Sequence, residues 1–260
     1  MPIHYACEEH IVTITIDRPE RKNAMDMDHF TGLADSWRRF RDDPDAWVAI
    51  ITGVGSAFCT GADLKTFIPQ VTGQLPKPEN WKPENGVHAV LKDLEIFKPI
   101  IAAVNGDCVA GGMEMLGGID IRIATPNARF GVLEPKRGLF AGGGTTVRLP
   151  RQIPFPAAME FLLTADLISA EQALAMGLLN RVVAPDQLMP TALDFARRIT
   201  ANAPRAVQAT KESVLQGLAM DLPQAFQNER RLAGLVFATE DAKEGPRAFA
   251  EKRPPRWQGK

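Results

Sequence analysis

Two glutamates and a pair of glycines in residues 105–134 have the side-chain types needed for proton transfer beside a carbonyl group. Gly111 and Gly112 come just before Glu114, and Glu134 follows after one further excursion of the chain. Glycine lets a substrate approach backbone N–H groups, which can stabilise negative charge on an oxygen. A carboxyl group among apolar residues can stay protonated near neutral pH and act as an acid. This combination indicates an enzyme.

The composition is that of a globular protein with a substantial core. The chain has 260 residues, of which 45% are hydrophobic and 23% charged, and its formal net charge is -1 at pH 7. Such a length suits one large domain, or a domain with an appendage. No polybasic segment occurs, so neither nucleic acid nor an anionic membrane is an expected partner. The four histidines lack metal-ligand spacing, and we expect no metal site.

Cysteine usage and the N-terminal segment indicate the compartment. Cys7, Cys59 and Cys108 are scattered, which fits reduced thiols in the core better than a disulfide framework. The segment Met1–Ile16 lacks the basic and apolar regions of a signal peptide. No apolar stretch reaches the ~18 residues that a membrane-spanning helix needs. We therefore expect a cytoplasmic protein.

Strand and helix patterns alternate over most of the chain, which predicts an α/β fold. The predicted strands are Ile11–Ile16, Trp47–Thr52, Ile100–Val104 and Asp120–Ala124. The predicted helices are Asp28–Arg41, Val109–Leu116 and Thr164–Gly177, the last with a plausible start at Ser169-Ala170-Glu171. Residues 68–87 are rich in Pro, Gly and Asn, and are either a lid over a binding site or a disordered insertion.

The C-terminal region differs because only helical patterns occur there. The predicted helices are Thr191–Ala201, Pro204–Met220 and Leu222–Ala238. We therefore divide the chain into a core at residues 1–193, which holds the active site, and a helical region at residues 194–260. A helical appendage without a large core of its own usually packs on a neighbour, so we expect this region to mediate oligomerisation.

Several motifs, in a fixed order, resemble the enoyl-CoA hydratase/isomerase (crotonase) superfamily over nearly the whole chain. They are Asp17-Arg18-Pro19, Asn23-Ala24-Met25, AFCTGADL (57–64), KPIIAAVNG (98–106), the glycine pair with Glu114, FGVLE (130–134), LTADLISAEQALAMGLLNRVV (163–183) and EGPRAFAEKRPPRW (244–257). The resemblance implies a spiral of ββα turns followed by a C-terminal helical trimerisation region. Two trimers commonly stack into a hexamer in this superfamily.

The resemblance also implies how an acyl-CoA thioester would be bound. The thioester oxygen would accept hydrogen bonds from the backbone amides of Ala62 and Gly111, which form an oxyanion hole. The positions that correspond to substrate and CoA contacts in the family are Lys22, Ala24, Gly61, Ala62, Asp63, Leu64, Lys65, Gly111, Gly112, Leu133, Gly142, Phe249 and Lys252. The family places the contacts from the C-terminal helix in a neighbouring subunit, so the implied partner is a second copy of the chain.

The implied reaction is the reversible syn addition of water to a 2-enoyl-CoA, giving a 3-hydroxyacyl-CoA. By resemblance, Glu114 is the base that activates water and Glu134 is the acid. The substrate's own thioester is the electron sink, so no cofactor is expected, and the enzyme would be a lyase of fatty acid metabolism. The chain departs from the usual family pattern at Leu133 and at Leu139–Thr145, and a basic pair, Lys136-Arg137, follows Glu134 as in one subgroup.

Other functions on the same fold remain open at this point. A dehydratase of a modified acyl-CoA, of the carnitinyl-CoA type, could use the same two glutamates. Double-bond isomerases of the superfamily usually retain only one of them. A non-catalytic acyl-CoA-binding protein is a further alternative, because fold does not fix function. The sequence does not decide the acyl group, the pathway, or whether the oligomer is a trimer or a hexamer.

Overall fold

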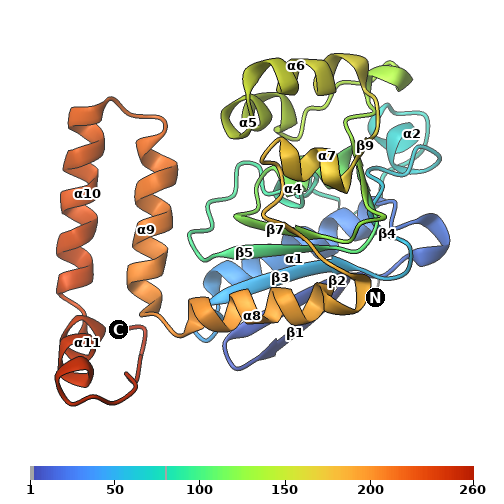
Figure 1. The fold of residues 1–260 in the computed structure, drawn as a ribbon. Helices are drawn as coiled ribbons and strands as arrows, with labels where there is room; N and C mark the ends of the chain where they lie inside the picture. The colour runs from blue at the N-terminus through green and yellow to red at the C-terminus, as the bar shows by residue number, and fades with distance from the viewer. Residues whose placement is uncertain (1–2, 80) are drawn as a thin grey trace.

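The computed structural model describes residues 3–79 and 81–260, which fold into two β-sheets with surrounding helices (Figure 1). The six-stranded sheet has the order β1-β2-β3-β5-β7-β10, with bounds Ile3–Glu8, Ile11–Ile16, Val48–Gly53, Ile100–Val104, Ile121–Ala124 and Arg181–Val182. The four-stranded sheet has the order β4-β6-β8-β9, with bounds Ala57–Cys59, Asp107–Val109, Arg129–Gly131 and Ile168–Ser169.

The chain advances as a spiral, because successive turns add one strand to each sheet. Strands β3, β5 and β7 pair in parallel in the larger sheet, and the strands that follow them, β4, β6 and β8, pair in parallel in the smaller sheet. Helices follow these strand pairs: α1 (Met27–Asp42), α2 (Phe67–Val71), α3 (Pro83–His88), α4 (Gly111–Leu116), α5 (Thr145–Gln152) and α6 (Phe155–Thr164). The predicted α/β class and the spiral of ββα turns are both confirmed.

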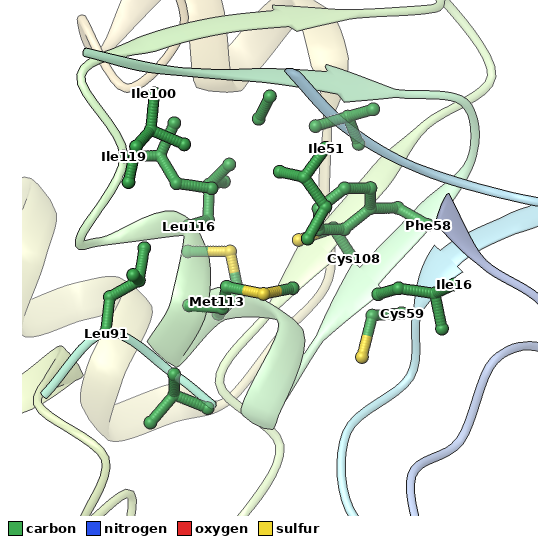
Figure 2. Close-up of a cluster of buried hydrophobic side chains, with 14 of the residues drawn as sticks. Ile16, Ile51, Phe58, Cys59, Leu91, Ile100, Cys108, Met113, Leu116 and Ile119 are labelled. Atoms are coloured by element: carbon green, nitrogen blue, oxygen red, sulfur yellow. The ribbon is translucent and has the colours of Figure 1, made fainter. Parts of the chain in front are cut away.

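A buried cluster between the two sheets holds α4 in place (Figure 2). It includes Ile51 and Ile100 from the larger sheet, Phe58 from the smaller sheet, and Met113 and Leu116 from α4, none of them more than 1% exposed. Burial of large apolar side chains stabilises such an arrangement by about 1.5–3 kcal/mol for each side chain. The cluster therefore fixes the helix that carries Glu114.

The opposite face of the larger sheet is covered by α8 (Leu188–Thr200), which packs its buried side chains against β3, β5 and β7. The predicted division at residue 193 falls inside α8, and the chain leaves the sheet only after this helix. The helices α9 (Pro204–Gly217), α10 (Leu222–Phe237) and α11 (Glu240–Ala250) then stand beside the core (Figure 1). Among the described residues, no helix is long and apolar enough to cross a membrane.

The tail helices expose large apolar side chains, including Leu218, Leu222, Phe226, Leu235 and Phe237. Lys211 of α9 connects the tail with the core. Its ammonium group donates to Asp120 Oδ2 at 2.7 Å and to the carbonyl oxygen of Lys98 at 3.0 Å. Asp120 Oδ2 also accepts from the backbone N–H of Ile100, at 2.7 Å. These hydrogen bonds join the tail to the N-terminal ends of strands β5 and β7 of the larger sheet.

Three predictions about local structure need correction. Thr164–Gly177 is not one helix, because Ala165 has a positive φ of 51° and the chain then pairs as β9 with β8. The predicted start at Ser169 is right, since its side chain forms a capping box that opens α7 (Ala170–Ala175). Val109 belongs to β6 rather than to the helix that follows. Cys7 is exposed on the edge strand β1, whereas Cys59 and Cys108 are buried free thiols.

The segment at residues 68–87 contains helical structure at both ends rather than a continuous loop. Most of α2 and nearly all of α3 fall within it, and residue 80 lies outside the described residues. Phe67, just before the segment, and Ile68, Gly86 and Val87 within it border a cavity of about 560 Å³. The segment therefore forms part of the cover of that cavity.

Candidate active site

Two loops meet at the edge of the smaller sheet, where β4 and β6 end side by side. Because β4 and β6 are parallel neighbours, residues 60–62 and 110–111 leave the sheet at the same edge. Gly61 has a φ of +85°, and a Cβ added to it would lie 2.8 Å from the backbone nitrogen of Gly111. Only glycine combines that backbone conformation with so close an approach. The two loops are therefore in direct backbone contact.

Two backbone amides at this junction have no hydrogen-bond acceptor among the residues that the structure describes. Met25 N donates to Gly61 O at 2.7 Å and Asp63 N to Met25 O at 2.8 Å, which leaves the N–H of Ala62 unused. Gly111 is the first residue of α4, where N–H groups lack an intrahelical acceptor. Within residues 3–79 and 81–260, neither amide makes a hydrogen bond to protein, and both residues border the same cavity. Together they offer two donors to one ligand oxygen.

Glu114 projects from the first turn of α4 toward the glycine-rich turn before α5. Its Oε1 accepts a hydrogen bond from the backbone N–H of Gly143 at 2.5 Å. Burial raises the pKa of Glu114, while the Gly143 amide and the charges of Lys92 and Arg148 act in the opposite direction. A Cβ on Gly143 would lie 2.3 Å from Glu114 Oε2, so a side chain here would displace the Glu114 carboxyl group. The triple glycine at 142–144 is the sequence feature that could have indicated this contact.

Glu134 lies directly before the short 3-10 helix η2 (Pro135–Arg137), and its carboxyl group has a different environment. Its Oε2 is buried and makes no hydrogen bond in the described structure. Burial, and to a smaller extent the charge of Glu114, raise the pKa of Glu134 to about 7. Two neighbouring carboxyl groups whose environments differ in this way can serve as a base and an acid.

The cavity that both glutamates border has a volume of about 560 Å³. Apolar side chains form much of its wall, among them Phe30 from α1, Phe67 at the start of α2 and Val87 from α3. A cavity of this size, largely apolar with a few convergent polar groups, is typical of sites that bury a small-molecule ligand. Low local polarity also strengthens electrostatic interactions with a bound substrate.

Arg148 of α5 supports the glutamate on α4, a role that no pattern in the sequence indicated. Its guanidinium donates to the carbonyl oxygens of Glu114 and Val90, each at 3.2 Å, and to that of Leu91. Leu91 lies three residues after α3 and has a positive φ of 58°. The hydrogen bonds of Arg148 to Val90 and Leu91 therefore hold the turn that follows α3. Arg148 therefore connects the backbone beneath Glu114 with the segment that covers the cavity.

The structure brings some of the predicted site residues to the cavity wall and leaves others away from it. The residues on the wall are Ala62, Leu64, Gly111, Glu114, Leu133, Glu134 and Gly142. Those that do not border the cavity in this chain are Lys22, Ala24, Gly61, Asp63, Lys65, Gly112, Phe249 and Lys252. Wall residues that the sequence did not reveal are Phe30, Phe67, Arg137, Phe140 and Gly143.

The predicted residues away from the wall have identifiable contacts of their own. Asp63 pairs with Arg18 at 3.2 Å, and a Cβ on Gly112 would lie 2.4 Å from Cys59 O, so both positions are determined by packing. Phe249 is on α11, and Lys252 follows it, in the tail that stands beside the core (Figure 1). Neither residue borders the cavity of its own chain.

The fold and the site define a member of the enoyl-CoA hydratase/isomerase family. The family model described as "Enoyl-CoA hydratase/isomerase" matches residues 6–260, and the chain belongs to this family. It is 41% identical over 251 residues to the enoyl-CoA hydratase EchA19 of Mycobacterium tuberculosis, covering 96% of this chain and 94% of that protein. It is 40% identical to the (E)-benzylidenesuccinyl-CoA hydratase of Thauera aromatica, with complete coverage of both.

Solved structures give the same assignment. The crystal structure of an enoyl-CoA hydratase from Mycobacterium tuberculosis superposes with a TM-score of 0.92 at 38% identity, covering 100% of this chain and 99% of that one. That of the enoyl-CoA hydratase EchA1 from Mycobacterium marinum gives a TM-score of 0.91 at 39% identity, with the same coverage. The protein is thus an enzyme with the crotonase fold, of the hydratase type.

Proposed function

We propose that this enzyme adds water reversibly across the C2–C3 double bond of a 2-enoyl-CoA to give a 3-hydroxyacyl-CoA. The observation that carries the proposal is the convergence of four groups on one cavity. Two backbone amides without acceptors among the described residues, at Ala62 and Gly111, border the same cavity as two carboxyl groups, at Glu114 and Glu134. This set matches the needs of a reaction that develops an enolate beside a thioester.

The amides would bind the thioester oxygen as negative charge develops on it. Preorganised N–H donors of this kind contribute roughly 3–4 kcal/mol each to stabilisation of the transition state. Because the donors at Ala62 and Gly111 are backbone groups, they need no side-chain reorganisation when the substrate binds. The electrons of the double bond flow into the thioester itself, so the proposed reaction uses no further cofactor.

The two carboxyl groups would divide the proton transfers. Glu114, held by Gly143 and near the positive charges of Lys92 and Arg148, is the carboxylate that takes a proton from water while the water oxygen bonds to C3. Glu134, with a pKa of about 7, is the acid that gives its proton to C2. Exchange of protons with solvent then restores the starting states. The reverse sequence removes water from a 3-hydroxyacyl-CoA.

The dehydratase alternative uses the same groups and differs in the acyl substituent. The carnitinyl-CoA dehydratase of Proteus mirabilis is 35% identical over 263 residues, so this relative is consistent with either direction of the reaction. Carnitinyl groups carry a quaternary ammonium, whose recognition typically uses aromatic faces or nearby negative charge. The cation among the charged residues on the described wall is Arg137, which favours a simple or anionic acyl group over a cationic one.

We also propose that the protein works as a homo-oligomer, as a trimer or a dimer of trimers. The exposed apolar side chains of α9 and α10 support an interface there, because exposed apolar patches of this kind mark association surfaces. In an assembly, Phe249 and Lys252 of one protomer could reach the CoA moiety bound to another. Light scattering of the purified protein tests the stoichiometry, and a monomer at micromolar concentration would contradict it.

The function is tested by adding purified protein to crotonyl-CoA and to longer 2-enoyl-CoAs. We expect loss of the conjugated-thioester absorbance and formation of the 3-hydroxyacyl-CoA, measured by mass spectrometry as addition of one water. Glu114→Gln and Glu134→Gln should lose this activity. Their matched control is Glu171→Gln, the same chemical change at an exposed position on α7. Absence of hydration with every chain length tested would defeat the proposal.

A further inference from the structure

A single cationic residue borders the cavity. Among the described residues on its wall, the charged ones are Glu114, Glu134 and Arg137. Both glutamates have a task in the proposed reaction, and Arg137 has none. It ends η2, three residues after Glu134. Arg137 is exposed, and much of the remaining wall is apolar, so its guanidinium is the positive charge that the described part of the wall offers to a ligand.

Arg137 has no acidic partner in the described parts of the chain. Its neighbour Lys136 pairs with Asp166 at 2.6 Å, on the outside of the same turn. Within the described residues, the Arg137 side chain donates one hydrogen bond, from Nη1 to the carbonyl oxygen of Lys136 at 3.2 Å. A guanidinium has five N–H donors, so most of the hydrogen-bonding capacity of Arg137 is unused.

Arg137 also does not neutralise the two glutamates. A guanidinium in contact with Glu134 would lower its pKa, but that pKa is raised to about 7. The charges that lower the pKa of Glu114 are those of Lys92 and Arg148. Arg137 forms no ion pair with Glu114 or Glu134 within the described residues, and its charge is not among the causes that shift the pKa of either carboxyl group, although all three residues border one cavity.

The backbone around Arg137 is well defined. Its N–H donates to Glu134 O at 2.9 Å, the N–H of Leu139 donates to the same oxygen at 3.0 Å, and Gly138 ends the turn with a φ of +66°. The position of Arg137 relative to Glu134 is thus fixed by the turn, while its long side chain can extend away from the acid. A group bound by Arg137 would therefore lie within reach of a side chain whose backbone starts three residues after Glu134.

We propose that Arg137 binds a carboxylate at the distal end of the acyl group, so that the preferred substrates are 2-enoyl-CoA thioesters carrying a second, free acid group. The planar guanidinium fork matches a carboxylate in a bidentate arrangement. Glu134 acts on C2, so the turn that it shares with Arg137 lies on the acyl side of the thioester. This proposal deepens, and rests on, the hydratase function proposed above.

Two observations favour the acyl group, rather than the phosphates of CoA, as the part of the substrate that Arg137 binds. The apolar side chains of Phe67, Ile68 and Val87 border the same cavity and would surround the methylene groups between the double bond and the distal acid. Lys22, a predicted phosphate contact, lies at the loop of the amides, where its carbonyl oxygen accepts from Thr60 Oγ1 at 3.0 Å. A separate basic position is thus already present near the thioester-binding loop.

The test compares two substrates of equal length, 5-carboxy-2-pentenoyl-CoA and 2-hexenoyl-CoA. We expect the wild-type enzyme to have the higher kcat/KM for the carboxylated substrate. Arg137→Gln should lower that value by about 10- to 100-fold, as is typical for loss of a charged hydrogen-bonding partner, and leave the neutral substrate within about threefold. Arg137→Lys should give an intermediate loss, because it keeps the charge but not the fork.

The matched control is Lys136→Gln, which removes a cation from the same turn but outside the cavity, and we expect both substrates to be unaffected. An equal loss with both substrates in Arg137→Gln would place the guanidinium on the CoA moiety and overturn the proposal. A wild-type preference for the neutral substrate would overturn it as well.

A binding measurement separates this proposal from the proposed reaction. Adipyl-CoA and hexanoyl-CoA are saturated counterparts that cannot be hydrated, and calorimetry can compare their affinities for wild type and Arg137→Gln. Tighter binding of adipyl-CoA that Arg137→Gln abolishes would support the carboxylate site even if neither enoyl-CoA were hydrated, an outcome that defeats only the hydratase proposal. Equal affinities for the two ligands would defeat the carboxylate site.

Discussion

Two regions that border the cavity hold their functional groups in different ways. In the contact between the loops at residues 60–62 and 110–111, the donors are backbone amides of Ala62 and Gly111, positioned by a close contact with Gly61. In the region of the carboxyl groups, the side chains of Glu114 and Glu134 have different hydrogen-bonding environments. The first region depends on backbone geometry and the second on local electrostatics. Substitutions should therefore fail for different reasons in the two regions.

The largest effect is expected from loss of either carboxyl group. Glu134→Gln and Glu114→Gln should each lower kcat by about 100- to 10,000-fold, the range typical of a general acid or base, and preserve the fold. Steady-state hydration kinetics and circular dichroism measure the two quantities. Full turnover by either variant would contradict the assigned role.

A smaller but still large loss of kcat is expected when the backbone donors at Ala62 and Gly111 are displaced. In Gly61→Ala, the new Cβ would lie 2.7 Å from Ala110 Cβ and 2.8 Å from Gly111 N, so the two donors must separate. Loss of one such donor lowers kcat by about 100- to 1,000-fold. Gly73→Ala is the matched control, since Gly73 has a similar φ of +78° with open space around its Cβ position. Comparable activity of the two variants would indicate that backbone strain, rather than the contact, matters at Gly61.

The supporting role of Arg148 should appear mainly in the pH profile. Arg148→Met removes a positive charge that lowers the pKa of Glu114, so the acid limb of kcat/KM should move to higher pH, with an activity loss of about tenfold at neutral pH. The control is Arg151→Met, at an exposed position on the same helix. Loss of activity without movement of the acid limb would indicate a purely structural role.

The wild-type enzyme should lose hydration activity as the pH rises above about 7. Glu134 must be protonated to deliver its proton, and its pKa is about 7. Measurement of kcat/KM for crotonyl-CoA between pH 6 and 9 should show this basic limb. A profile that stays flat to pH 9 would exclude Glu134 as the acid.

The smallest expected effect is on stability. The pKa of Glu134 is higher in the folded protein than its ordinary value of 4.5, so the folded state binds the proton more tightly, and its contribution to stability declines as the pH rises from about 4.5 to about 7. Glu134→Gln should therefore raise Tm more at pH 8 than at pH 5, by roughly 1–3 °C. Differential scanning fluorimetry at both pH values checks the sign.

The sequence predicted the regular parts of the fold well, because local patterns determine them. The strand Ile100–Val104 was predicted with its observed bounds, since five consecutive apolar residues follow a proline. Strands β4, β6 and β8 have only three residues each and were not predicted from periodicity. The break at Ala165 was missed because it depends on pairing of β9 with a distant strand.

The candidate site was predictable as far as motifs extend, and less so beyond them. The glycine pair and the two glutamates carried their own chemical signal, and resemblance supplied Ala62. Contacts between distant segments had no such signal. Phe30 and Phe67 stack with ring centroids 4.4 Å apart in the wall, although 37 residues separate them in sequence. Arg148 contacts the carbonyl oxygen of Glu114 across 34 residues.

The hydrogen bonds of Arg148 have a mechanical consequence for the enzyme. One guanidinium donates hydrogen bonds to the carbonyl oxygens of Val90 and Leu91, just beyond α3, and to the carbonyl oxygen of Glu114. A displacement of the main chain just beyond α3 would therefore act on the main chain at Glu114 through one planar group. We expect the position of this segment and the position of the Glu114 carboxyl group to depend on each other.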